Sequence, residues 1–136
     1  MKTYEFIEHT ADIGIKAYGK SISEAFKNAA VGMFDIITNK SKIKKVGEYK
    51  IQLNSPDIEQ LLVDWLSELL FLNSAKNLVF SEFNVNVNNT NLSAQIFGEE
   101  FNHSRHNIGT EIKAVTYHML KVQNKKPYFV QVLFDI

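Results

Sequence analysis

The sequence contains no cysteine, and only two prolines and six glycines are found among its 136 residues. Without cysteine there can be no disulfide framework, no thiolate zinc site and no cysteine nucleophile. No segment is rich enough in proline or glycine to act as a linker between domains, and no repeat divides the chain. We therefore expect a single domain that spans residues 1–136.

The chain also lacks an excess of charge of either sign and lacks a long hydrophobic run. Fifteen Lys plus Arg balance fifteen Asp plus Glu, so we expect no direct strong binding to nucleic acid, which needs many phosphate-neutralising side chains. No segment approaches the roughly 18 apolar residues of a membrane helix, and the first residues do not form a signal peptide. We expect a cytoplasmic protein with no membrane partner.

Known catalytic motifs are missing as well. The sequence has no phosphate-binding loop of the Walker type, no G-x-G-x-x-G, no G-x-S-x-G, no H-E-x-x-H and no EF-hand loop. No serine is marked by its surroundings as a nucleophile. We therefore assign no catalytic residue.

Two segments have the periodicity of helices that bury one face. In the first, apolar residues recur at steps of three and four from Ile22 to Ile37, Ser21 and Glu24 form a capping box, and Asn39 is a left-handed stop. In the second, Ser55 is expected as the N-cap and Pro56 as the first helical residue. Its apolar stripe, from position 58 to 72, is wide enough to place this helix at the centre of the core.

Most of the remaining chain alternates between apolar and polar residues, which is typical of strands. An Asn-rich turn at 88–91 predicts a hairpin in the third quarter of the chain. Residues 110–116 fit either a helical turn or a strand. The expected strands lie at 3–8, 13–18, 46–53, 79–87, 92–96, 116–123 and 128–135. The predicted fold class is α+β, a single-domain sandwich of mainly antiparallel strands covered by two main helices.

One candidate site consists of carboxylates near the two ends of the chain. Asp12 stands at the start of a predicted strand, and an apolar strand runs to Asp135 and Ile136. If these strands pair, the two side chains and the terminal carboxylate of Ile136 converge, and they repel one another unless a cation neutralises them. Oxygen donors of this kind select a hard cation such as calcium or magnesium. The alternative is that Asp12 caps a turn and Asp135 lies in water.

Other polar residues have both a functional and a structural interpretation. His103 and Arg105-His106 could bind phosphate or a transition metal, but a solvated loop explains them as well. The lysine run at 40–45 fits a solvated loop or a contact with RNA or an acidic partner. His9 and His118 fit structural histidines. Lys113, in an apolar stretch, either reaches the surface or pairs with a carboxylate.

Five motifs, in order along the whole chain, resemble the archease family. They are Glu8-His9-Thr10-Ala11-Asp12-Ile13-Gly14-Ile15, the helix from Ala25-Phe26 to Gly32-Met33-Phe34, Leu61 to Leu70, Gly109-Thr110-Glu111-Ile112-Lys113-Ala114 with the residues to His118, and Phe134-Asp135-Ile136. The first, fourth and last are polar and idiosyncratic, so a shared core pattern does not explain them. The turn at 88–91 is the part of this sequence that departs most from the pattern of the family.

The resemblance implies a non-catalytic protein that activates an RNA ligase of the RtcB type in tRNA splicing and RNA repair, by promoting guanylylation of the ligase by GTP and its multiple turnover. It implies a fold like an elaborated strand-helix-strand-strand module and a divalent metal ion, with calcium expected. The implied metal ligands are Asp12, Asp135 and Ile136. The implied functional contacts are Lys113, Glu111 and His9.

Two other functions compete with this one. A metal-dependent nucleotide or RNA hydrolase could use the same carboxylates, and it would turn over substrate without a partner. A chaperone or modulator of an RNA-modifying enzyme, such as a tRNA methyltransferase, would not need the acidic residues.

Overall fold

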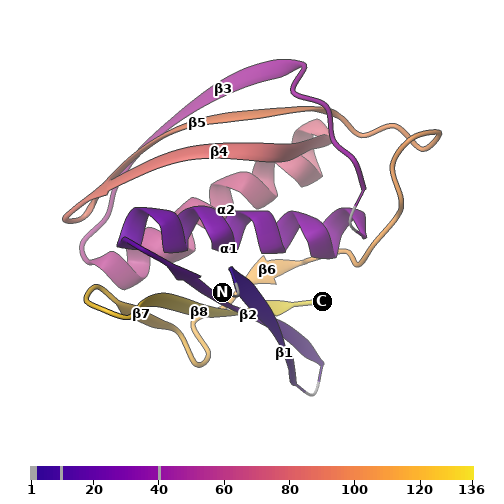
Figure 1. Cartoon of the computed structure of the whole chain (residues 1–136). Helices are drawn as coiled ribbons and strands as arrows, with labels where there is room; N and C mark the ends of the chain where they lie inside the picture. The colour runs from indigo at the N-terminus through magenta and orange to yellow at the C-terminus, as the bar shows by residue number, and fades with distance from the viewer. Residues whose placement is uncertain (1–2, 10, 40) are drawn as a thin grey trace.

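The structure, a computed structural model, describes residues 3–9, 11–39 and 41–136. Two helices lie between two antiparallel sheets (Figure 1). The elements, in chain order, are β1 (Tyr4–His9), β2 (Asp12–Gly19), α1 (Ile22–Thr38), β3 (Gly47–Asn54), α2 (Ile58–Lys76), β4 (Leu78–Asn88), β5 (Asn91–Glu100), β6 (Ala114–Val115), β7 (Lys121–Gln123) and β8 (Tyr128–Asp135).

The two sheets divide the strands between the ends and the middle of the chain. The lower sheet in Figure 1 has the order β1-β2-β8-β6, with β7 also pairing with β8. The upper sheet has the order β3-β5-β4. Because β2 pairs directly with β8, residues from both ends of the chain meet in one sheet. The α+β fold class predicted from the sequence is confirmed.

The first helix begins and ends where the sequence predicts. The Ser21 hydroxyl accepts a hydrogen bond from the Glu24 N–H at 3.1 Å, and Asn39 adopts the left-handed conformation, with φ 52°. These contacts satisfy backbone groups that have no partner inside a helix. The buried face of α1 packs between the sheets and includes Phe26, Ala29, Met33 and Phe34.

The start predicted for the second helix is wrong by two residues. Asp57, not Ser55, is the N-cap of α2, because its carboxylate accepts the Gln60 N–H at 2.7 Å. Ser55 instead donates its hydroxyl proton to Asp64 at 2.6 Å. Both residues are good N-caps, so residue type alone did not separate them.

One hydrophobic core joins both helices to both sheets. Leu62, Trp65 and Leu69 of α2 are fully buried in it, together with Phe26 and the nearly buried Phe34 of α1, as predicted. The Trp65 indole donates to the Phe26 carbonyl at 3.1 Å, which links the helices. No helix in the described residues is long and apolar enough to span a membrane.

The strands agree with the prediction in order but differ in length. The hairpin of β4 and β5 is longer than predicted and turns at Asn89, whose φ is 56°. Within residues 110–116 only Ala114–Val115 forms a strand. The strand predicted at 116–123 is reduced to Lys121–Gln123.

Candidate functional site

The candidate carboxylates lie in a single row across one end of the lower sheet. Asp12 of β2 pairs with His9 of β1 on one side and with Asp135 of β8 on the other. Asp135 in turn pairs with Ala114 of β6. The C-terminus lies at this end of the sheet (Figure 1). The predicted convergence of Asp12 with Asp135 is therefore present in the pairing of the strands.

The register places two negative charges side by side. Directly opposite residues of an antiparallel pair point to the same face, with Cβ atoms about 4.5–5.5 Å apart, and like charges there destabilise the sheet. Asp12 is half-buried and Asp135 is exposed. A nearby positive charge or donor would relieve this repulsion. The exposed position of Asp135 is also the one expected if its side chain lies in water.

The terminal carboxylate follows Asp135 by one residue. Ile136 is 38% exposed. In residues 3–9, 11–39 and 41–136, no three His, Asp or Glu side chains form a metal-ligand cluster. The donors here are two opposed carboxylate side chains and one main-chain carboxylate, a set of hard oxygen donors that fits calcium or magnesium by type.

The segment before β6 holds Lys113 next to this row. Gly109 and Thr110 donate their N–H groups to the Ile37 and Ile36 carbonyls, at 3.0 and 2.9 Å, at the end of α1. A Cβ atom on Gly109 would lie 2.1 Å from the Ile36 oxygen, so only glycine allows this approach. Ile112 is buried.

Lys113 itself has its backbone fixed and its side chain exposed. Its N–H donates to the Asp135 carbonyl at 2.7 Å. Glu111 and Lys113 are both exposed and line a groove of about 510 Å³ together with Phe71 of α2. The structure thus brings two of the three expected contact residues to one surface.

Apolar side chains are exposed around the same end of the molecule. A second groove, of about 430 Å³, is lined by Phe6, Ile13 and Ile108, among others. Phe6 is 42% exposed, Ile108 73% and Phe71 52%. Large exposed apolar side chains that gather around polar groups are typical of surfaces that bind another protein.

The remaining expected residues lie elsewhere or outside what is described. The backbone of His9 lies in the carboxylate row, but its side chain lies outside the described part of the structure, as does Lys40. His103 and His118 are exposed. In the lysine run, Lys42, Lys44 and Lys45 are exposed, as expected for a solvated loop, and Lys45 pairs with Glu82 at 3.0 Å.

The interpretation of His106 as part of a solvated loop is wrong. Its ring is buried, its Nδ1 accepts the Asn102 N–H at 2.8 Å, and its Nε2 lies 2.9 Å from the Glu99 carboxylate. Since Nδ1 accepts, the network assigns the proton to Nε2. This geometry leaves neither nitrogen for a metal or a phosphate.

Glu99 is a buried structural carboxylate that sequence reasoning missed. It pairs with Arg105, contacts His106 and accepts the Lys44 N–H at 2.6 Å. The Arg105 guanidinium is the main reason that the pKa of Glu99 falls to about 2. The cluster anchors the loop that leads from β5 to Gly109. An acidic residue near the end of an apolar strand is the only signal the sequence offers for it.

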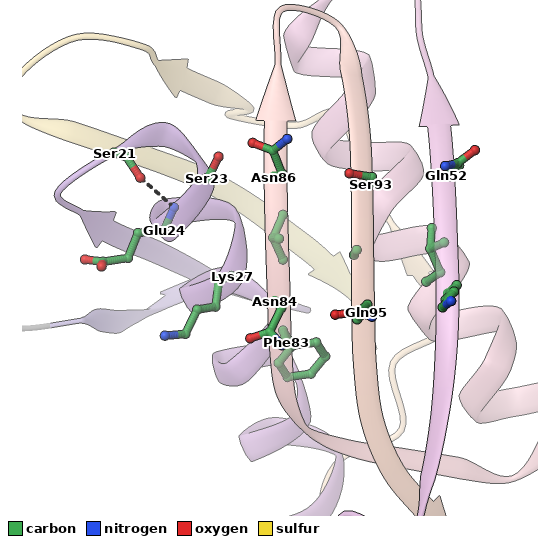
Figure 2. A pocket seen from close by; sticks show the side chains of 14 residues that line it. Ser21, Ser23, Glu24, Lys27, Gln52, Phe83, Asn84, Asn86, Ser93 and Gln95 are labelled. Atoms are coloured by element: carbon green, nitrogen blue, oxygen red, sulfur yellow. Dashed lines mark hydrogen bonds between the residues drawn. The ribbon is translucent and has the colours of Figure 1, made fainter.

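The described residues also form a polar hollow of about 710 Å³, lined by the start of α1 and by the three strands of the upper sheet (Figure 2). The Ser21 hydroxyl accepts from Glu24 N–H, and the Ser23 hydroxyl accepts from Val87 N–H at 2.8 Å. The described residues that line this hollow include no histidine that could serve either serine as a general base. The hollow does not carry the groups of a serine hydrolase.

Comparison with known proteins identifies the family. Residues 4–136 match the model of the Archease protein family. The chain belongs to the archease family. The archease of Sulfurisphaera tokodaii is 40% identical to this chain over 132 residues, which cover 96% of this chain and 95% of the relative. An archease of Saccharolobus islandicus is 43% identical to it over 139 residues, which cover 100% of both chains.

Solved structures agree with the archease fold. The solution structure of Methanobacterium thermoautotrophicum protein 1598 superposes with a TM-score of 0.86 at 35% identity and covers all of both chains. The crystal structure of an archease from Thermotoga maritima, described as a possible chaperone, gives 0.63 at 24% identity over 96% of this chain and 94% of the other. The latter supports the fold alone.

Proposed function

We propose that this archease is a non-catalytic cytoplasmic activator of an RtcB-type RNA ligase, which promotes guanylylation of the ligase and its multiple turnover. The observation that carries the proposal is the row of Asp12 and Asp135 with the Lys113 backbone bonded to Asp135. This end of the sheet exposes a lysine and carboxylates, and it is bordered by exposed apolar side chains, which suits contact with a protein partner.

The same row suggests where a divalent cation would bind. Asp12, Asp135 and the Ile136 carboxylate are oxygen donors, and calcium is the ion we expect there. When bound, such an ion supplies positive charge that stabilises phosphate oxygens. Lys113 adds an ammonium group with three donors on a flexible stem. Together with Glu111 and His9, it is expected to contact the ligase near its nucleotide.

The activator hypothesis is supported over a hydrolase by the chemistry of the described side chains. Lys113 and Asp135 are exposed rather than enclosed in a pocket that excludes water. Hydrolysis at a carboxylate-bound metal depends on a shaped site that fixes substrate and water. An open edge is better suited to complete a site on another protein.

A guanylylation assay tests the proposal. An RtcB-type ligase is incubated with labelled GTP, and ligase-guanylate is measured with and without this protein. We expect the rate of guanylate formation and the number of turnovers to increase. The protein alone, given GTP or RNA, should produce no turnover. Hydrolysis by the protein alone would favour the hydrolase, and an unchanged ligase rate would contradict the activator.

A further inference from the structure

Another concave region lies at the opposite end of the lower sheet from the carboxylates. At that end Gly19, the last residue of β2, pairs with Tyr128, the first residue of β8. Seven residue-to-residue steps along each strand separate this pair from Asp12 and Asp135, about 23 Å at the usual rise per residue. A pocket of about 760 Å³ lies here, and its wall is mainly apolar; it is lined by Glu5, Tyr18, Gly19, Lys20, Lys126, Pro127 and Tyr128.

The aromatic ring of Tyr18 is held in place in this wall. Its hydroxyl donates to the Glu5 carboxylate at 3.3 Å, and its ring centroid lies 6.4 Å from that of Phe129 on the neighbouring strand. Burial, followed by the charge of Glu5, raises the pKa of the Tyr18 hydroxyl, which therefore stays neutral. A ring fixed by its neighbours loses little conformational freedom when a ligand stacks on it.

Positive charge surrounds this aromatic wall. The Lys16 ammonium lies 4.5 Å from the centroid of the Phe129 ring and 5.6 Å from that of Tyr18. Lys20 and Lys126 line the pocket and are exposed. Within the residues that the structure describes, neither of these two forms an ion pair. Among the described residues that line the pocket, Glu5 is the one acidic side chain against two lysines, so their charges sum to a positive value.

An aromatic face next to unpaired ammonium groups matches the two parts of a nucleotide. Bases of any sequence stack on aromatic side chains, and phosphates are neutralised by lysines, in proteins that bind single strands. We propose that this pocket binds single-stranded nucleic acid, with a base stacked on Tyr18 and the flanking phosphates at Lys20 and Lys126. Because the net charge of the chain is zero, binding is local and of modest affinity.

The side chains around the pocket favour a nucleic-acid strand over a membrane surface as the ligand. Binding at a lipid interface depends on apolar side chains that protrude into the acyl region. Here the rings of Tyr18, Tyr128 and Phe129 are half-buried. The inference goes beyond the proposed function, since it concerns the other end of the sheet and requires no ligase.

Fluorescence anisotropy with a labelled oligouridylate of about twelve nucleotides tests the proposal. The double variant Lys20→Gln/Lys126→Gln should bind the oligonucleotide at least fivefold more weakly. Its plot of the logarithm of the association constant against the logarithm of the salt concentration should be less steep by about 1.4. Tyr18→Leu should weaken binding at least fivefold, whereas Tyr18→Phe keeps a stacking ring and should retain it. The matched control is Lys27→Gln/Lys50→Gln, which removes two lysines from the polar hollow of Figure 2.

Specific results would overturn the proposal. These are no saturable binding by the unaltered protein at low salt, an equal loss in the control pair, or uridine monophosphate binding as tightly as the oligonucleotide. Binding to anionic vesicles that depends on the same lysines, without binding to the strand, would identify a membrane surface instead. Thermal unfolding of each variant confirms that it is folded.

Discussion

Asp12 and Asp135 are direct cross-strand partners on β2 and β8, so that residues near the two ends of the chain form one acidic pair. A sheet does not gain stability from like charges in this position. We propose that this acidic pair serves the function of the protein, and each part of that proposal can be tested separately.

Calcium binding should depend on Asp12. At about 100 times its Kd, calcium should add about 2.7 kcal/mol to the free energy of unfolding, because only the folded sheet brings the donors together. Asp12→Asn should abolish most of this gain. Asp57→Asn, which retains an N-cap of equal quality, should keep it. Thermal unfolding with calcium and with a chelator measures both. Equal stabilisation of the two variants would contradict the site.

The terminal carboxylate should contribute to the same affinity. Two residues appended after Ile136 convert its carboxylate into an amide and move the charge by about 7 Å. We expect at least a fivefold weaker calcium affinity by titration calorimetry. Ile136→Val, which keeps the terminal carboxylate in place, is the control. An extended protein that binds as tightly as the original would exclude Ile136 as a ligand.

Gly109 should be required for stability because it lets the Lys113 segment approach α1. Gly109→Ala would place a Cβ atom 2.1 Å from the Ile36 oxygen, and the resulting backbone shift should cost about 1–3 kcal/mol. Gly47→Ala, whose new atom meets its nearest neighbour at 3.4 Å, should cost much less. Urea unfolding measures both changes, and equal costs would refute this role.

Glu99 should make stability depend on acid pH. Its pKa is lowered from 4.5 to about 2 in the folded protein, so its contribution is present above pH 4.5 and is lost as the pH falls toward 2. Glu99→Gln should lower the free energy of unfolding at neutral pH, because the buried side chain loses its charged pairing with Arg105 and its charged contact with His106. In the variant, the free energy of unfolding should fall less steeply between pH 4.5 and pH 2 than in the unaltered protein. An unchanged decline would show that other carboxylates cause it.

The sequence predicted the elements whose signals are local. The stripe and caps of α1 specify its limits, and the alternation around Asn88–Asn91 specifies the hairpin. Asp12 and Asp135 could be paired from sequence only through the assumption that their strands are neighbours. The structure supports that pairing through backbone register.

The role of the loop between β5 and β6 could not be predicted in the same way. His106 is buried because Glu99 and the Asn102 N–H satisfy both ring nitrogens. That environment is created by tertiary contacts, and no periodicity reports it. The two-residue error at the start of α2 has a similar origin, since Ser55 found a partner in Asp64.

The functional role of Lys113 gives the most direct test of the account. Lys113→Met keeps the length and apolar stem of the side chain and removes its charge, while the exposed Lys50→Met on β3 is the matched control. The measurement is the rate of ligase-guanylate formation from GTP by an RtcB-type ligase. We predict that Lys113→Met unfolds at nearly the same temperature as the unaltered protein but increases the rate of ligase-guanylate formation at least tenfold less. Lys50→Met should activate the ligase normally. Full activation by Lys113→Met would contradict the account.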